Sequence, residues 1–199
     1  MREVRVGRVL AASLHQAIAD LLPTRLEFYE HWLRVDSLHE GTIGVAPMQA
    51  VFSFLRQEGD VYHAVMRQAG RDAARWMVAA MSGAGRALVK RLPVFLRRRA
   101  LLIVAGRFVR QNWQESRVSQ RARGGVVRVD VKDSIFCGVR EPIGHPLCAF
   151  HAALYSEILA LFDVQSEASV VACRAMGSDA CTLEILTAAA SPGGEAAAA

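Results

Sequence analysis

Long uninterrupted apolar runs are missing from this sequence of 199 residues. A membrane-spanning helix needs about 18 or more consecutive apolar residues, and no segment reaches that length. The first thirty residues carry charges throughout, including Arg2, Glu3 and Asp20, whereas a secretory signal has an uncharged apolar core. The sequence therefore argues against a membrane span and a signal peptide, and we expect a cytoplasmic protein.

Two sequence motifs and any early cysteine are also absent. The glycines of Ser82-Gly83-Ala84-Gly85 follow no strand pattern and lack a third glycine, so there is no dinucleotide fingerprint. No nucleic-acid-binding motif accompanies the net charge of +5, so we expect no nucleic-acid partner. No cysteine occurs before Cys137, and all four lie in the last third of the chain. The chemistry that the sequence encodes is therefore concentrated there.

The composition suits one globular domain, with 52% hydrophobic and 22% charged residues. We expect this domain to span residues 1–187, followed by a disordered tail over 188–199. Asp60 is a candidate N-cap, and Gly70 in the middle of a helix indicates that something packs closely against it. Helical spacing of apolar residues predicts helices over 8–22, 25–35, 48–57 and 60–80, with a loop over 41–47, and two more helices within 86–110 separated by Pro93.

The last third changes to strand patterns. Residues 126–131 alternate apolar and polar side chains, and the turn signal Gly124-Gly125 before them predicts a hairpin. A loop over 134–146 leads to a helix over 150–162, and turn-forming residues 174–180 join strands over 169–173 and 181–186. The turn would therefore bring Cys173 and Cys181 close together across the second hairpin.

The section from Arg86 to Arg110 is the most basic of the chain, and it interleaves eight Lys or Arg residues with apolar ones. A basic amphipathic surface of this kind can contact a membrane surface or grip an acidic ligand. The alternative is that the arginines only solvate the outer face of a helix. The pattern alone leaves both open.

The four cysteines follow the spacing C-x10-C-x24-C-x7-C. In a cytoplasmic protein, clustered cysteines indicate metal or redox chemistry more often than disulfides. The hairpin pair, together with Cys137 and Cys148, can converge on a tetrahedral thiolate site, a geometry that zinc prefers. The alternative is that some of the four are small buried apolar side chains, and the spacing leaves both open.

Residues 134–186 resemble the 4-vinyl-reductase-type domain, which is related in fold to trafficking-complex subunits of the TRAPP type. The resemblance rests on Pro146-Leu-Cys148-Ala-Phe150, the helix after it, and Cys173-Arg-Ala-Met-Gly177-Ser-Asp-Ala-Cys181-Thr-Leu-Glu-Ile185. Cys137 ahead of Cys148 is most similar to the bacteriochlorophyll-biosynthesis branch, known as 4-vinyl protochlorophyllide reductase. The resemblance implies an α+β fold with helices packed on one side of an antiparallel sheet, a buried hydrophobic pocket and a homodimer.

The resemblance also implies a structural zinc ion, which relatives that sense aromatic compounds hold through three cysteines and a glutamate. The motif match assigns the three cysteine positions to Cys148, Cys173 and Cys181. The glutamate usually lies three residues before the first hairpin cysteine, where this chain has Val170. A fourth thiolate would keep the coordination tetrahedral, so we expect Cys137 to take that place. The alternatives are Glu167 in a shifted register or a histidine.

A vinyl reductase needs a hydride or electron source, which proteins supply through a nicotinamide, a flavin or an iron–sulfur cluster. Because no dinucleotide fingerprint is present, we expect a non-catalytic binding or accessory protein for a hydrophobic small molecule. The resemblance implies that this molecule is a tetrapyrrole intermediate of bacteriochlorophyll synthesis, and basic residues would pair with its carboxylates. The predicted ligand-binding residues are Trp76, Arg86, Lys90, Arg107 and His151.

Each of these residues also has a plainer interpretation, Trp76 as a core aromatic and His151 as an ordinary histidine. Two other functions are alternatives. A 4-vinyl tetrapyrrole reductase would carry a coloured cluster or a bound flavin. A sensory or assembly module would dock a protein partner on the basic helices and would show no affinity for a pigment.

Overall fold

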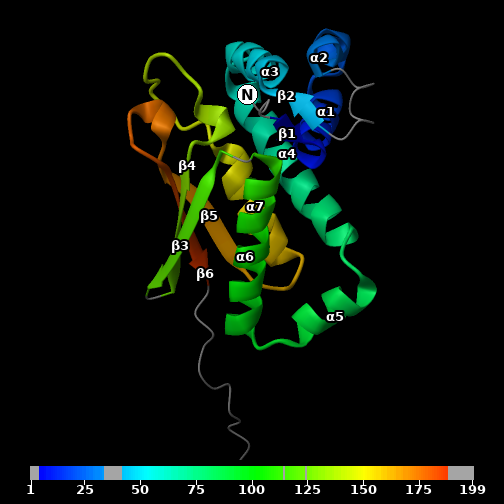
Figure 1. Ribbon diagram of the computed structural model, residues 1–199, viewed down its shortest axis with the longest axis vertical. Helices are drawn as coiled ribbons and strands as arrows, with labels where there is room; N and C mark the ends of the chain where they lie inside the picture. The colour runs from blue at the N-terminus through cyan, green and yellow to red at the C-terminus, as the bar shows by residue number, and fades with distance from the viewer. Residues whose placement is uncertain (1–4, 34–41, 114, 124, 188–199) are drawn as a thin grey trace, which may run out of the picture.

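The α+β class predicted from the sequence is confirmed by the computed structural model, which describes residues 5–33, 42–113, 115–123 and 125–187. The first half of the chain is helical, and the second half contains a four-stranded antiparallel sheet in the order β3-β4-β6-β5 (Figure 1). The tail predicted over 188–199 lies outside the described residues. Within them, no helix is both long enough and apolar enough to cross a membrane.

Seven helices and six strands follow one another along the described chain. The helices are α1 (Arg8–Leu21), α2 (Leu26–Leu33), α3 (Val45–Gln57), α4 (Asp60–Ala79), α5 (Gly83–Arg91), α6 (Val94–Asn112) and α7 (Ala149–Ala160). The strands are β1 (Arg5–Gly7), β2 (Thr42–Gly44), β3 (Arg117–Arg123), β4 (Val126–Lys132), β5 (Ser166–Ala172) and β6 (Cys181–Thr187). Short 3-10 turns occur at η1 (Pro23–Arg25), η3 (Ile135–Cys137) and η4 (Arg174–Met176).

Two local predictions, for residues 41–47 and for Asp60, were wrong. The loop expected over 41–47 contains β2 and the start of α3, where Pro47 is tolerated because the first helical N–H groups have no intrahelical acceptor. Asp60 is not the N-cap of α4, because Gly59 takes that place with φ of 63° and Asp60 is the first helical residue. The glycines after Ser82 open α5, with the Ser82 hydroxyl accepting a hydrogen bond from the Gly85 N–H at 3.1 Å.

One face of the sheet is buried and the other is exposed. Along β4 the side chains of Val127, Val129 and Val131 are buried, while Arg128 between them is exposed and pairs with Glu184 across the strands. This alternation shows that the helices pack on a single side, as predicted. Helix α7 covers β5 and β6, α6 lies beside β3, and α4 packs on the far side of α7 (Figure 1).

Helices α4 and α7 approach each other closely because Gly70 has no side chain. A Cβ atom at Gly70 would lie 2.4 Å from the carbonyl oxygen of Phe150 and 3.0 Å from the Cβ of Ala153. The close packing predicted for this glycine is therefore confirmed. This close packing places α4 in contact with α7, the helix whose N-cap is Cys148.

Candidate metal centre and ligand groove

Four separate pieces of the chain deliver the cysteines. Cys137 is the last residue of η3, and Cys148 is the N-cap of α7. Cys173 follows the end of β5, and Cys181 is the first residue of β6. Gly177, with φ of 93°, reverses the chain between these two strands in a conformation that favours glycine. The predicted hairpin is thus confirmed, and it faces the start of α7.

The four sulfur atoms lie at the corners of a compact tetrahedron. Their six Sγ–Sγ distances run from 3.0 Å, between Cys148 and Cys181, to 3.9 Å, between Cys148 and Cys173. All of them are free thiols, well beyond the disulfide bond length of about 2.05 Å. A tetrahedral zinc ion with Zn–S bonds of about 2.3 Å separates its sulfurs by about 3.8 Å. The four buried cysteines can therefore hold a metal ion between them.

Backbone and hydroxyl groups face the sulfurs from outside. The N–H of Leu147 donates to the Cys173 sulfur at 3.4 Å, and the N–H of Arg174 donates to the Cys181 sulfur at 3.5 Å. Such donors stabilise negative charge on thiolates and orient them, as outer-shell groups do around metal sites. The site thus has the donor set and the surroundings of a closed four-thiolate centre.

The thiols perturb one another strongly. Hydrogen bonds from the thiols of Cys137, Cys148 and Cys181 lower the pKa of Cys173. Hydrogen bonding with the sulfurs of Cys137, Cys173 and Cys181, and then burial, raises the pKa of Cys148. Four buried thiolates cannot share so small a volume without a compensating positive charge. A divalent cation would supply that charge.

Cys137 joins the other three cysteines, whereas the alternative ligands lie elsewhere. Among the described residues, the group that could hold a metal consists of the four cysteines alone. Glu167 is exposed on β5, paired with Leu186 of β6. Val170, which stands where relatives carry the glutamate, lines a surface groove instead. The geometry therefore brings Cys137 together with the other three cysteines, and its role as the fourth ligand stays a prediction.

His151 is buried beside the metal centre without joining it. Its Nε2 atom lies 3.2 Å from the Ser134 hydroxyl, which in turn lies 3.5 Å from the Cys148 sulfur. Burial lowers the pKa of His151 to about 4, so the ring is neutral near pH 7. Its Nδ1 atom has no partner among the described residues, and His151 lines a small hollow of about 10 Å³, which has room for no more than about one water molecule.

The other predicted ligand-binding residues are scattered over the surface. Trp76 lies near the end of α4 and is 38% exposed, Arg86 and Lys90 lie on α5, and Arg107 is exposed on α6. Lys90 lies 3.8 Å from the carboxylate of Asp163. The structure does not gather these residues around one hollow with His151, and their shared role stays a prediction.

A groove of about 450 Å³ runs between α4, α7 and β5. Its rim carries His63, Arg67 and Arg71, which lie four residues apart and therefore share one face of α4. Its floor is made of small side chains of α7 and β5, namely Ala149, Ala152, Ala153, Ser156, Ala160, Ser166, Ala168 and Ser169. The sequence analysis missed this site, although the spacing 63, 67 and 71 was a readable signal.

Residues 127–187 match the sequence profile of the V4R domain, the 4-vinyl-reductase-type domain. The matched segment covers under a third of the chain and includes all four cysteines. Among curated proteins, none matches the sequence significantly.

Two solved structures share the fold at low sequence identity. An H-NOX protein from S. oneidensis in the Fe(II)NO ligation state is 12% identical with a TM-score of 0.57, covering 91% of this chain and 98% of its own. An unliganded Fe(II) H-NOX mutant from K. algicida is 10% identical with a TM-score of 0.57, covering 91% and 96%. A trafficking protein particle complex subunit 3 from Naegleria fowleri is 12% identical and aligns less well, with a TM-score of 0.46, covering 88% of this chain and 95% of its own. These findings support a V4R-type domain in the last third of an H-NOX-like α+β fold.

Proposed function

We propose that this protein is a non-catalytic carrier of a hydrophobic small molecule with acidic groups, and that a zinc ion braces its fold. The observation that best supports a bound zinc ion is the tetrahedron of four buried sulfurs, whose edges measure 3.0 to 3.9 Å. A site closed by four thiolates leaves no open position for a substrate, which is the pattern of structural rather than catalytic zinc. A four-sulfur tetrahedron also accepts iron, so the identity of the metal needs a direct test.

Elemental analysis and an absorption spectrum of protein purified under reducing conditions provide that test. We expect one zinc per chain and no band in the visible range. An iron content with a visible band would instead favour the reductase alternative, and a protein purified without any metal would contradict the proposal. Because a serine hydroxyl is a poorer zinc ligand than a thiolate, we expect Cys137→Ser to lower the zinc content or the stability.

Glu167→Gln is the matched control for the fourth ligand. Glu167 is exposed on β5, outside the group of four cysteines, so its substitution should leave the zinc content unchanged. If Cys137→Ser kept full zinc and wild-type stability, while Glu167→Gln lost both, the assignment of Cys137 would be wrong.

The groove between α4, α7 and β5 is our candidate for the ligand site. Its volume of about 450 Å³ lies within the usual range of small-molecule sites, about 300 to 1,000 Å³. Its small alanine and serine side chains leave room for a flat body, and Arg67 and Arg71 suit carboxylates, while the carboxylate of Glu157, which also lines the groove, pairs with Arg75. A tetrapyrrole intermediate of bacteriochlorophyll synthesis combines both features, and the resemblance of residues 134–186 supports that choice.

Fluorescence titration with protoporphyrin tests this assignment. We expect saturable binding of the porphyrin and no turnover when a reductant is added. The double variant Arg67→Glu/Arg71→Glu should bind up to about 30-fold more weakly, since each exposed ion pair contributes up to about 1 kcal/mol. Arg8→Glu, an exposed arginine at the start of α1, is the control and should bind as the wild type does. If the double variant bound the porphyrin as tightly as the wild type, the groove would not be the ligand site. If the reductant were oxidised only when porphyrin is present, the alternative function as a reductase would be favoured.

The homodimer implied by the resemblance is part of the proposal. Light scattering after size-exclusion chromatography measures it directly, and a monomer at micromolar concentration would contradict it.

A further inference from the structure

Helix α5 and the start of α6 leave a set of large apolar side chains exposed. We define the α5–α6 arm as residues 83–103, which comprise α5, the corner at Leu92 and Pro93, and the first turns of α6. None of the residues of α5 is buried. The exposed fractions are 66% for Leu88, 45% for Val94, 63% for Phe95 and 40% for Leu96. Four such side chains within nine residues mark an interaction surface rather than a solvated helix.

The charge that the arm itself carries has one sign, although Asp163 of the loop after α7 lies 3.8 Å from Lys90. From residue 73 to residue 114 the sequence contains nine Lys or Arg residues and neither Asp nor Glu. Six of the nine lie in the α5–α6 arm, at positions 86, 90, 91, 97, 98 and 99. Arg97 is turned inward and donates to the backbone carbonyls of Lys90, Leu92 and Phe162, which holds the corner against the body of the protein. The apolar corner is therefore fixed in place and surrounded by positive charge.

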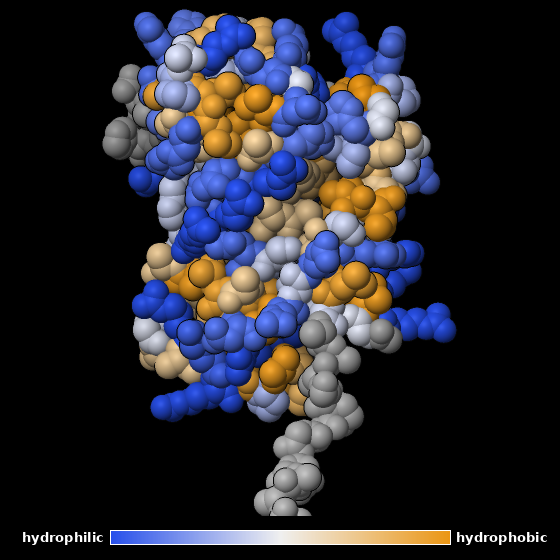
Figure 2. Space-filling model, turned by 180° about the vertical axis from the view of Figure 1, so that it is seen from behind, coloured by the Kyte–Doolittle hydropathy of each residue, from blue (hydrophilic) through white to orange (hydrophobic). Residues whose placement is uncertain are grey.

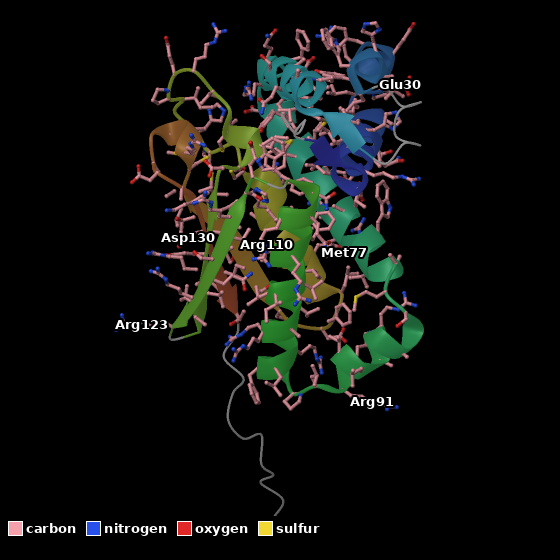
Figure 3. All side chains as sticks on the ribbon, viewed as in Figure 1. Glu30, Met77, Arg91, Arg110, Arg123 and Asp130 are labelled. Atoms are coloured by element: carbon pink, nitrogen blue, oxygen red, sulfur yellow. The ribbon has the colours of Figure 1, made fainter. Side chains whose placement is uncertain are left out.

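The α5–α6 arm forms one end of the molecule. Figure 1 shows α5 and the start of α6 at the end opposite α2, and Figure 3 shows Arg91 at the same end, far from Glu30. Seen from behind, apolar and hydrophilic side chains lie next to one another over the lower half of the surface (Figure 2). Of the four apolar side chains, Phe95 lines a groove beside the arm, whereas Leu88, Val94 and Leu96 lie outside the lining of that groove.

A second groove of about 450 Å³ lies beside this corner, between α6 and β3. Its apolar lining includes Phe95 and Ile103, and its charged lining consists of Arg98, Arg99 and Arg121. Apolar side chains beside three guanidinium groups can bind an acyl chain and the phosphate at its end. This groove extends the charge and the apolar surface of the arm onto the sheet.

We propose that the α5–α6 arm docks on a bilayer that contains anionic phospholipid, with Leu88, Phe95 and Leu96 entering the interface and the arginines facing the headgroups. A second copy of this chain is a poorer occupant, because a symmetric contact would bring two sets of six positive charges together. A partner helix would place its apolar face in a groove, whereas Leu88 and Leu96 lie outside the lining of the groove beside α6, as side chains that enter a planar surface can. This inference does not depend on which small molecule the protein carries.

Flotation with vesicles tests the inference. We expect the protein to float with vesicles of phosphatidylcholine and phosphatidylglycerol, to remain unbound with phosphatidylcholine alone, and to lose binding as salt is raised. Each basic residue near an anionic surface contributes about fivefold in affinity, so Arg91→Glu/Arg99→Glu should weaken binding by more than about 25-fold. Phe95→Ser/Leu96→Ser should weaken binding as well, since it removes the apolar side chains.

Two variants at the opposite end serve as matched controls. Phe28→Ser replaces an exposed phenylalanine of α2, and Arg8→Glu replaces an exposed arginine of α1. Both should float as the wild type does, and unchanged zinc content and circular dichroism would show that every variant folds. Absence of flotation with the anionic vesicles would overturn the inference, as would equal flotation of the arm variants and the controls. A dimer that dissociates only in the arm variants would assign this surface to a second copy instead.

Discussion

Replacing Gly70 with alanine is the sharpest test of how α4 is held against α7. The new Cβ would lie 2.4 Å from the Phe150 carbonyl oxygen, 3.0 Å from the Ala153 Cβ and 3.1 Å from the Leu154 nitrogen. Two of these three atoms belong to the backbone of α7, so no side-chain rotation can relieve the contact. The two helices would have to separate by a large part of an ångström.

The expected loss follows from two opposing effects. Alanine in a helix interior is favoured over glycine by about 1 kcal/mol, whereas overpacking a filled interior costs about 1 to 3 kcal/mol and occasionally more. Because the obstructing atoms are backbone, the upper part of that range applies, and we expect a net destabilisation of about 1 to 2 kcal/mol. For a chain of this size, that corresponds to a fall in melting temperature of about 2 to 8 °C.

Urea denaturation followed by circular dichroism measures this loss. Gly83→Ala is the matched control, since Gly83 opens α5 and a Cβ there would meet nothing within 4 Å. We expect the control to change the free energy of unfolding by no more than about 0.5 kcal/mol. If Gly70→Ala were as stable as the wild type, the close approach of α4 and α7 would be incorrect.

Three further substitutions probe the core and its attachments. Arg97→Ala removes hydrogen bonds to three backbone carbonyls and should cost about 1.5 to 3 kcal/mol by urea denaturation, and Arg97→Lys should restore little because lysine lacks the planar fork. Leu183→Ala leaves a cavity under α7 and should cost about 2 to 5 kcal/mol, whereas Leu186→Ala on the exposed face should stay within about 0.5 kcal/mol, as calorimetry would show. Tyr62→Phe leaves the Leu147 carbonyl without its buried donor and should cost about 1 to 3 kcal/mol in the same assay. Equal stability of the leucine pair, or a neutral Tyr62→Phe, would contradict the burial described for these residues.

Much of the fold could be predicted because its longer elements have a strong local pattern. The period of the apolar residues predicted α1, α3, α4, α6 and α7, and Gly124-Gly125 and Met176 to Asp179 predicted the two hairpins. Strands β1 and β2 have three residues each, too few for an alternation to show. Pro47 suggested a loop, although proline in the first turn of a helix loses no hydrogen bond.

The site could be predicted only in part from the residues. The Cys173 and Cys181 pair follows from local turn chemistry, but their approach to Cys137 depends on how α7 packs on the sheet. Spacing alone therefore left the metal open, and the resemblance supplied it. The spacing of residues 63, 67 and 71 is visible in the sequence, but the groove that they line depends on how α4, α7 and β5 pack together, which no local pattern indicates.

The separation of the four thiols along the chain sets an order in which a metal can be captured during folding. Cys173 and Cys181 are 8 residues apart, whereas Cys137 and Cys181 are 44 apart. Closing a short loop costs less chain entropy, so the β5–β6 hairpin can offer a two-thiolate chelate before α7 has docked. An ion held there would then recruit Cys148 and Cys137. The metal concentration in the cell would thus control how fast the last third of the chain reaches its native state, and not only how stable that state is.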